Sequence, residues 1–253
     1  MQEAKQEAIS ILSFGGGVNS VALMILLLQE KQPLDEVVFA DTGSEVPETY
    51  AYLEIAERYL ANRGVPFRTV TRRNRKTLQE TCAERRVIPS AVWRWTTRDF
   101  KVRPIHSYYR TLGKPINQYL AIAWDEVERM KDSRDDYIVN LFPLVDRRIT
   151  RAGCVQIIED AGLPVPEKSG CFFCPFNSLS RWRWLADRHP ELYEQAVELE
   201  EGSKHFPSQR LTDQVFRARD NVTLRELRTR FEQTGELESG ETEVSPCGGE
   251  CMT

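Results

Sequence analysis

Three consecutive glycines, residues 15–17, lie between two apolar runs, and this arrangement constrains the fold more than any other feature of the sequence. The run before them, residues 9–13, is short and contains β-branched side chains, whereas the run after them, residues 18–28, is apolar nearly all round. The two runs predict a buried strand followed by a buried helix. At the start of such a helix the backbone N–H groups of the glycines can bind an anion such as a phosphate. A tight turn that binds no ligand would use glycines in the same way.

The same plan of strand and helix repeats along the next part of the chain. Residues 37–40 predict a second strand, and a helix from Pro47 to about residue 63 leads to a third strand at residues 66–70. Residues 118–124 and 138–144 predict two more strands, followed by a helix that Thr150 caps and that ends near residue 160. Strands that alternate with helices predict an α/β fold with a doubly wound, mostly parallel sheet.

A change of pattern follows the prolines at positions 164 and 166. Beyond them the sequence predicts a cysteine-bearing turn, helices around residues 181–187 and 190–201, and a polar tail. We therefore predict an α/β domain over residues 1–165 and a small helical extension over residues 166–253, which ends in a flexible tail.

Charge and hydropathy exclude some classes of protein. The formal net charge of −4 over 253 residues argues against a protein that coats nucleic acid nonspecifically. Basic side chains nevertheless cluster within residues 72–75 and 94–103, as a polyanion-binding surface or a solvated loop would show. No apolar stretch is long enough to span a bilayer, and the N-terminus lacks the layout of a secretory signal. We expect a cytoplasmic protein with no membrane partner, and the sequence does not indicate its oligomeric state.

Four of the six cysteines form two close pairs. Cys171 and Cys174 have CxxC spacing on a predicted turn, and Cys247 and Cys251 flank two glycines near the end of the chain. In a reducing compartment such pairs indicate metal binding or redox chemistry before disulfides. Together they predict a four-thiolate metal site for Zn²⁺ or a [4Fe–4S] cluster, between which the spacing does not decide. A tail with incidental cysteines is the alternative.

Several motifs resemble those of a known family. GGGVNS at residues 15–20 resembles the SGGxDS loop of the PP-loop nucleotide α-hydrolases, with Gly15 in place of serine and Asn19 in place of aspartate. VVFADTGSEVPETY at residues 37–50 and TTRDFKVRPI at residues 96–105 resemble two further segments of the phosphoadenylyl-sulfate (PAPS) reductase-like branch. The resemblance extends over roughly residues 9–185.

The resemblance implies an ATP site with Mg²⁺. It assigns nucleotide binding to the following residues: Ser13, Gly15, Gly16, Gly17, Asn19, Ser20, Asp41, Thr42 and Gly43. It assigns catalytic contacts to phosphate and metal to Ser20, Arg98, Lys101, Glu126 and Arg129, with Arg103 and Glu128 as further candidates. A solvated helix start with an ion pair inside the helix would also explain the charges at residues 126–129.

The activity implied by the resemblance is cleavage of ATP to AMP and pyrophosphate, with transfer of the adenylyl group. We expect the acceptor to be DNA or RNA that receives sulfur, as in phosphorothioation systems, whose ATP pyrophosphatase components this branch resembles. The implied partners are an adenine nucleotide, nucleic acid held through other subunits, and a cysteine desulfurase as the sulfur source. Two alternatives remain. One is a thiol-dependent PAPS or adenylyl-sulfate reductase that uses Cys251, and the other is a non-catalytic nucleotide-binding subunit.

Overall fold

The computed structural model describes residues 7–90, 95–204, 215–216 and 222–234. Within these ranges, five parallel strands form one sheet in the order β3-β2-β1-β4-β5. The strands are β1 (Ile9–Phe14), β2 (Glu36–Ala40), β3 (Phe67–Val70), β4 (Ile116–Leu120) and β5 (Ile138–Leu141). The prediction of a doubly wound, mostly parallel α/β sheet is confirmed. Because the strand order reverses between β1 and β4, a ligand crevice is expected at the carboxyl ends of these strands.

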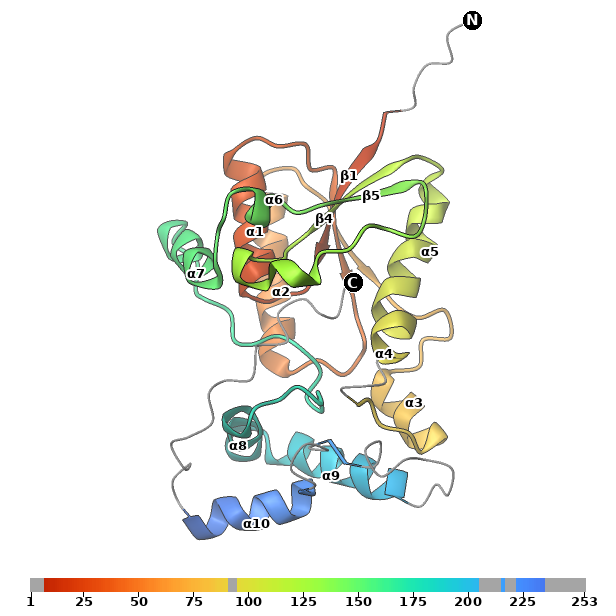
Figure 1. Cartoon of the computed structure of the whole chain (residues 1–253), viewed down its shortest axis with the longest axis vertical. Helices are drawn as coiled ribbons and strands as arrows, with labels where there is room; N and C mark the ends of the chain where they lie inside the picture. The colour runs from red at the N-terminus through yellow and green to blue at the C-terminus, as the bar shows by residue number, and fades with distance from the viewer. Residues whose placement is uncertain (1–6, 91–94, 205–214, 217–221, 235–253) are drawn as a thin grey trace, which may run out of the picture.

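Helices cover both faces of the sheet (Figure 1). On one face lie α1 (Val18–Gln29), α2 (Pro47–Ala61) and α7 (Arg151–Asp160), and on the other lies α5 (Arg103–Leu112). Alternate side chains of β1 point to opposite faces of the sheet, because Leu12 and Phe14 pack with α1 whereas Ile11 packs with α5. A strand covered on both faces is mainly apolar along its length, as β1 and β2 are, apart from the buried polar residues Ser10, Ser13 and Glu36.

Short helical turns connect the strands on the side of the sheet where the strands end. They are α3 (Leu78–Arg85), α4 (Trp95–Thr97), the π-helical turn η1 (Arg98–Val102), the 3₁₀ turn η2 (Trp124–Arg129) and α6 (Pro143–Asp146). Thr77 begins α3 with a capping box, in which its side chain accepts from Glu80 N–H and Glu80 reaches back to Thr77 N–H. These turns place charged side chains near the carboxyl edge of the sheet.

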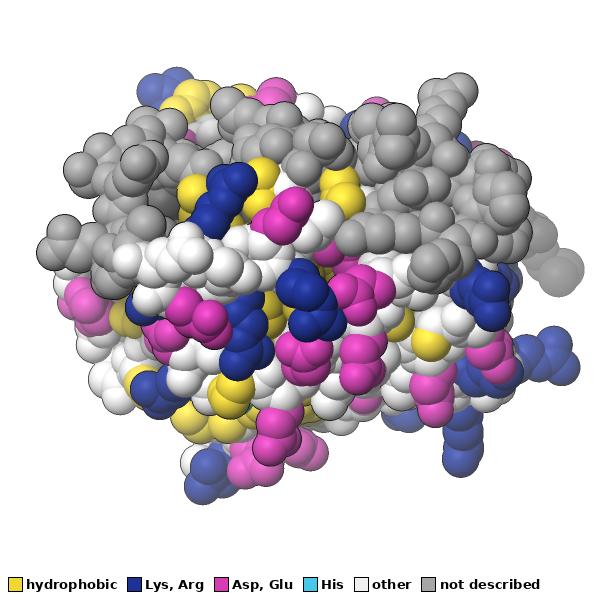
Figure 2. All heavy atoms as spheres, turned by 90° about the horizontal axis from the view of Figure 1, so that it is seen from below, with side chains coloured by type: hydrophobic (Ala, Val, Ile, Leu, Met, Phe, Trp, Pro, Cys, Tyr) yellow, Lys and Arg dark blue, Asp and Glu magenta, His cyan; other side chains and the backbone are white. Residues whose placement is uncertain are grey.

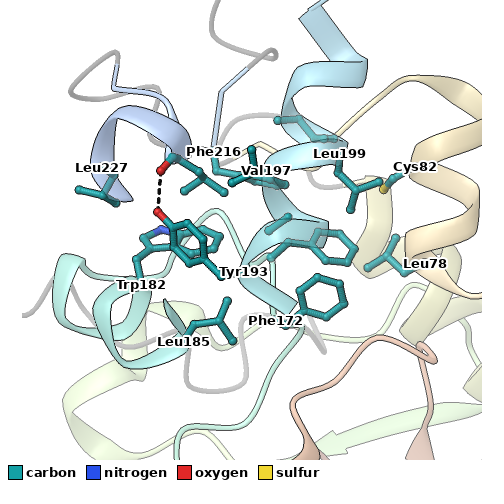
Figure 3. Close-up of a cluster of buried hydrophobic side chains, with 14 of the residues drawn as sticks. Leu78, Cys82, Phe172, Trp182, Leu185, Tyr193, Val197, Leu199, Phe216 and Leu227 are labelled. Atoms are coloured by element: carbon teal, nitrogen blue, oxygen red, sulfur yellow. Dashed lines mark hydrogen bonds between the residues drawn. The ribbon is translucent and has the colours of Figure 1, made fainter. Parts of the chain in front are cut away.

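A second hydrophobic cluster lies below the sheet in Figure 1 and is drawn in Figure 3. It is formed mainly by α8 (Leu179–Arg188), α9 (Pro190–Lys204) and α10 (Leu224–Thr234). Trp182 and Tyr193 are fully buried in it, and the Tyr193 hydroxyl donates a 2.6 Å hydrogen bond to the carbonyl of Leu224. None of the helices in the described ranges is both long and apolar enough to cross a membrane.

The predicted boundary at residue 165 stays a prediction. The cluster in Figure 3 joins side chains from both sides of that boundary, because Leu78 and Cys82 of α3 pack with Phe172 and Leu199. The two parts of the chain therefore share buried surface. The predicted flexible end of the tail, residues 235–253, lies outside the described residues.

Three predictions of secondary structure were wrong in detail. The strand expected at residues 118–124 is β4, which both begins and ends earlier. The strand expected at residues 138–144 ends at Leu141, because Pro143 begins α6. The polar tail predicted after residue 201 contains α10, whose side chains Leu224, Leu227 and Phe231 are buried in the second cluster. These three apolar residues lie at positions i, i+3 and i+7, which is the spacing of one helix face and was the available signal for α10. The many charged residues of the segment obscured this signal.

Figure 2 views the molecule from below and shows acidic and basic side chains interspersed over the described part of this face. The helices α8, α9 and α10 carry such ion pairs, for example Arg225 with Glu201 and Arg183 with Asp187. The described part of this face therefore carries mixed charge rather than a continuous basic surface of the kind that nucleic acid prefers.

Candidate nucleotide-binding site

The glycine loop joins β1 to α1, as the sequence predicts. Gly17 is the N-cap residue of α1 with extended backbone, and Gly16 has a φ of +74°, in the left-handed region that favours glycine. The hydroxyl of Ser20 donates a 2.9 Å hydrogen bond to the carbonyl of Gly17, which fixes the end of the loop. The first turn of α1 carries no acidic side chain. No acidic side chain in this turn would therefore repel an anion at the positive end of the helix.

Replacing Gly16 by alanine is expected to destabilise the protein by about 1–2 kcal/mol, because a side chain at this backbone conformation is strained. The new Cβ would also lie 3.2 Å from Cγ2 of Thr49. The matched control is Gly15→Ala, whose Cβ would have its nearest neighbour at 4.0 Å, on Ser20. Urea unfolding of both variants checks this, and equal midpoints for the two would contradict it.

Directly behind the loop, three buried side chains form a connected group, called here the buried triad: Asn19, Glu126 and Arg129. The amide nitrogen of Asn19 donates to Oε2 of Glu126 at 2.9 Å, and Nη1 of Arg129 lies 2.9 Å from Oε1 of the same carboxylate. Their exposures are 5%, 4% and 8%. Burial raises the pKa of Glu126, whereas the neighbouring Arg129 lowers it.

The buried triad has unused hydrogen-bonding capacity. All three guanidinium nitrogens of Arg129, and Oδ1 of Asn19, lack a hydrogen-bond partner among the described residues, since the Arg129–Glu126 contact is an ion pair without hydrogen-bond geometry. Buried polar atoms are rarely left in this state, because each costs free energy. The arrangement therefore fits a site completed by a charged ligand.

The same atoms allow a test of whether Mg²⁺ fits. Mg²⁺ prefers carboxylate and carbonyl oxygens, and usually keeps contacts to phosphates and water. Oδ1 of Asn19 is such an oxygen and is buried without a hydrogen-bond partner in the described part of the chain. Oε1 of Glu126 is another, although it already forms the 2.9 Å ion pair with Arg129. The donor set fits the ion, although Asn19 supplies a neutral oxygen where the PP-loop motif has a carboxylate.

The turn after β2 is fixed by its own side chains. Asp41 accepts hydrogen bonds from Gly43 N–H at 2.7 Å and from the Tyr50 hydroxyl at 2.8 Å. Gly43 has a φ of +66°, and a Cβ there would lie 2.5 Å from the side chain of Thr77. Asp41 thus orders the strand end, and its second carboxylate oxygen has room for a further partner.

A buried polar cluster follows the same turn. Lys101 Nζ lies 3.3 Å from Oε1 of Glu45, and the Thr42 hydroxyl donates to that oxygen at 3.0 Å. The sulfur of Cys171 lies 3.6 Å from the Thr42 hydroxyl and 3.9 Å from the Glu45 oxygen. Residues far apart in the sequence, from the end of β2, from η1 and from the cysteine-bearing turn, therefore meet at one point.

This cluster forms part of a pocket at the carboxyl ends of β1 and β2, called here the strand-end pocket. Its walls are largely apolar, with Phe14, Phe39, Leu78 and Phe173, and its cavity volume is about 80 Å³. Polar residues reach it from several segments: Gly15, Thr42, Lys101, Lys168, Ser169, Cys171 and Cys174. The pocket would accept part of a nucleotide, such as the flat face of a base, rather than all of it.

The first cysteine pair lies in this pocket. Cys174 N–H donates to the carbonyl of Cys171 at 3.1 Å, which places both cysteines on one turn. Over the described ranges no group of three or more His, Cys, Asp or Glu side chains is arranged to hold a metal ion. Cys247 and Cys251 lie outside the described residues, so the four-thiolate site stays a prediction. Burial raises the pKa of Cys82 and that of Cys154 to about 12, so neither thiol is reactive.

The structure separates the other predicted residues. Arg98 and Arg103 are exposed and both pair with Asp99, rather than with the glycine loop. Ser13 is buried and its hydroxyl donates to Gln118 at 3.2 Å, below the strand ends. Glu128 is exposed. Their predicted roles remain predictions.

Sequence reasoning missed Glu45. It lies four residues after Asp41, in the segment that carries the resemblance, and its side chain is almost completely buried. A carboxylate so close to the end of a buried strand was the available signal. Its partner Lys101 was identified, but the contact depends on the path of the chain between β2 and α5, which the sequence does not reveal.

The segment that runs from β1 into β4 matches a known protein family. Residues 9–119 match the family described as the phosphoadenosine phosphosulfate reductase domain. The resemblance to the PAPS reductase-like branch is confirmed for this segment. The PAPS reductase-like segment contains the glycine loop, the turn after β2 and Lys101. Of the buried triad it contains Asn19 but not Glu126 or Arg129, and the first cysteine pair also lies beyond its end.

More distant similarities cover more of the chain. An uncharacterized protein of Methanocaldococcus jannaschii is 24% identical over 197 residues, which is 73% of this chain and 40% of that relative. The chain thus spans less than half the length of this curated relative.

Two solved structures are similar to the chain to different degrees. The U34-tRNA thiolase NcsA from Methanococcus maripaludis, solved with its [4Fe-4S] cluster, has a TM-score of 0.50 and 13% identity, covering 99% of this chain and 82% of that one. The PAPS reductase from Candida auris, in its phosphate complex, has a TM-score of 0.44 and 14% identity, covering 64% of this chain and 76% of that one. At such identities the likeness to the thiolase concerns the fold alone.

Proposed function

We propose that the chain is an ATP pyrophosphatase that transfers the adenylyl group of ATP to an oxygen of a nucleic-acid acceptor, so that sulfur can then replace that oxygen. The observation that carries the proposal is the buried Arg129, whose guanidinium nitrogens lack hydrogen-bond partners among the described residues directly behind the glycine loop. A buried cation beside a helix N-terminus suits a polyphosphate, because both favour negative charge.

In the proposed reaction the acceptor oxygen attacks the α-phosphorus, the bond from that phosphorus to the bridging oxygen breaks, and pyrophosphate leaves with the bonding electrons. The glycine-loop amides hold the polyphosphate, and Arg129 neutralises charge that builds up on the leaving group. Mg²⁺, if bound through Glu126 and Asn19, would supply further neutralisation of the pyrophosphate oxygens. Positioning and charge neutralisation account for such catalysis without a covalent nucleophile.

The strand-end pocket is the proposed place of the adenine base. Its apolar walls suit an aromatic ring, and the buried polar side chains of Thr42 and Lys101 also line it. Gly15 lines this pocket and also begins the glycine loop. A nucleotide with its base in the pocket would therefore have its phosphates at the loop.

The sulfur step is proposed to use the four cysteines. Cys171 and Cys174 line the strand-end pocket, and we propose that Cys247 and Cys251 complete a [4Fe–4S] or Zn²⁺ site with them. The similarly folded NcsA is a tRNA thiolase with a [4Fe-4S] cluster, and this favours the iron–sulfur version and a nucleic-acid acceptor. A cysteine desulfurase, other subunits of a phosphorothioation-like system and a cytoplasmic location complete the proposal.

Incubation of the protein with ATP, Mg²⁺ and candidate acceptors is expected to yield AMP and pyrophosphate, because the attack occurs at the α-phosphorus. Chromatographic separation of the nucleotides, with a coupled assay for pyrophosphate, measures both products. Release of ADP and phosphate instead would refute the proposal. Tight ATP binding without turnover would favour a non-catalytic nucleotide-binding subunit.

A second candidate function is thiol-dependent reduction of PAPS, and the family match over residues 9–119 favours it. In that reaction a thiolate attacks the sulfur, the bond from sulfur to the phosphate oxygen breaks, and adenosine 3′,5′-bisphosphate leaves. A second thiol then attacks the sulfur of the first cysteine, so that a disulfide forms and sulfite leaves with the bonding electrons. Supplying PAPS and a dithiol reductant, and measuring sulfite, separates the two functions.

A further inference from the structure

A second cavity lies against the sheet on the α5 side and is not used by the proposed function. Its volume is about 520 Å³, several times that of the strand-end pocket. It is lined by η1, by α5, by β4 and β5, and by the segment of residues 131–135 that follows η2. Thr97 lines both cavities, so the two adjoin. Cavities of this size accept ligands as large as a nucleotide.

Two cations at this second cavity are without partners. The side chains of Lys131 and Arg134 line the cavity, are exposed, and form no ion pair or hydrogen bond with any residue that the structure describes. Arg98 adds a third cation, which is 61% exposed and pairs with Asp99. Lysine and arginine with free donors are the side chains that bind phosphate oxygens most strongly.

The acidic side chains at the cavity only partly offset this charge. Nδ1 of His106 lies 2.7 Å from Oδ2 of Asp135, and Arg110 lies 3.7 Å from the other oxygen of the same carboxylate. The negative charge of Asp135 is thus paired within the protein. Among the described lining residues, Asp132 is then the acidic side chain whose charge offsets that of Lys131 and Arg134. The His106 ring is fixed through Nδ1, and its Nε2 is left for a ligand.

The floor of the second cavity consists of fixed amides. Oε1 of Gln118 accepts from the Ser13 hydroxyl at 3.2 Å, and Nε2 of Gln118 donates to Oδ1 of Asn140 at 2.9 Å. Nδ2 of Asn140 in turn donates to the carbonyl of Lys131 at 2.9 Å. Each amide nitrogen carries a second hydrogen, and each amide oxygen a second lone pair. A row of amides held in this way can recognise the polar edge of a ring.

We propose that the second cavity binds a phosphate-bearing ligand of nucleotide size, separate from the nucleotide at the glycine loop. Lys131 and Arg134 hold its phosphate, and Gln118, Asn140 and His106 contact its polar, uncharged part. The proposal does not depend on which reaction the glycine loop supports, because it concerns binding at different residues.

The test measures equilibrium binding of the four ribonucleoside 5′-monophosphates to the full chain by calorimetry. The double variant Lys131→Glu and Arg134→Glu is expected to weaken binding by at least about tenfold, on the scale of one charge-assisted contact. The matched control is the double variant Arg58→Glu with Arg63→Glu, which changes the net charge by the same amount. Both residues are exposed. Arg58 lies in α2 and Arg63 just after it, and α2 covers the opposite face of the sheet. The control is expected to bind as the original protein does.

Further measurements distinguish this proposal from the proposed function. The double variant Glu126→Gln with Arg129→Gln removes both buried charges at the glycine loop together and is expected to leave monophosphate binding intact, whereas the cavity variant is expected to retain binding of an ATP analogue. Loss of monophosphate binding in that double variant, with its thermal stability retained, would place the ligand at the first site and overturn the second. The proposal would also be overturned if monophosphate binding were weakened equally in the cavity and control variants, or if no saturable binding were found in the millimolar range.

Discussion

Replacing Arg129 by glutamine is expected to lower the rate of AMP and pyrophosphate formation by roughly a hundredfold or more, the usual effect of removing one donor that stabilises developing charge. Arg129 is 8% exposed, and its guanidinium nitrogens have no hydrogen-bond partner among the described residues. A donor that is already dehydrated and fixed needs little reorganisation when a charged ligand arrives. The rate is measured by pyrophosphate release at saturating ATP.

The substitution has a structural cost that a second variant separates from catalysis. Without Arg129 the carboxylate of Glu126 is buried with only the Asn19 amide, and an uncompensated buried charge destabilises the fold. The double variant Glu126→Gln with Arg129→Gln removes both charges together. We expect it to recover thermal stability relative to Arg129→Gln alone while the rate remains low.

Arg129→Lys provides a further control, because it keeps the charge but loses the planar donor group. An intermediate rate is expected for it. Rates near that of the original protein in both Arg129→Gln and the double variant would show that the buried triad is structural, and the proposed function would lose its main support.

The sequence predicted the centre of the sheet because β1 and β2 are almost completely buried and therefore stand out as short, mainly apolar runs. The glycine loop was equally visible, since Gly16 needs a positive φ and the run is followed at once by an apolar helix. The carboxyl edge of the sheet as the place of the site follows from parallel strand pairing, which the alternation of strands and helices indicates.

The internal geometry of the site was not predictable in the same way. Lys101 and Arg98 are three residues apart in one motif, yet η1 buries Lys101 against Glu45 and leaves Arg98 exposed at the second cavity. Cys171 meets Thr42 across 129 positions of sequence. Such contacts depend on tertiary packing, and neither hydrophobic periodicity nor motif spacing contains that information.

The same limit explains the helix α10, which the sequence indicated only as part of a polar tail. Its position depends on Glu200 of α9, which is fully buried. Oε2 of Glu200 accepts from the backbone N–H of Leu224 at 2.8 Å, and Oε1 accepts from that of Phe216 at 3.0 Å. The first N–H groups of a helix have no hydrogen-bond partner inside the helix. The Glu200 carboxylate thus accepts a hydrogen bond from the first residue of α10, which lies 24 residues further along the chain.

Glu200→Ala is therefore expected to lower the free energy of unfolding by about 3–5 kcal/mol, because two buried backbone N–H groups lose a charged acceptor and stay unpaired. The neighbouring Glu201→Ala is the matched control. Glu201 is partly exposed and pairs with Arg225 at the surface, so its loss should cost about 0.5 kcal/mol or less. Urea unfolding monitored by tryptophan fluorescence suits both variants, since Trp182 is buried in the same cluster. If the two variants were equally stable, the carboxylate of Glu200 would not be what holds α10 in place, and the packing of Leu224, Leu227 and Phe231 would have to suffice.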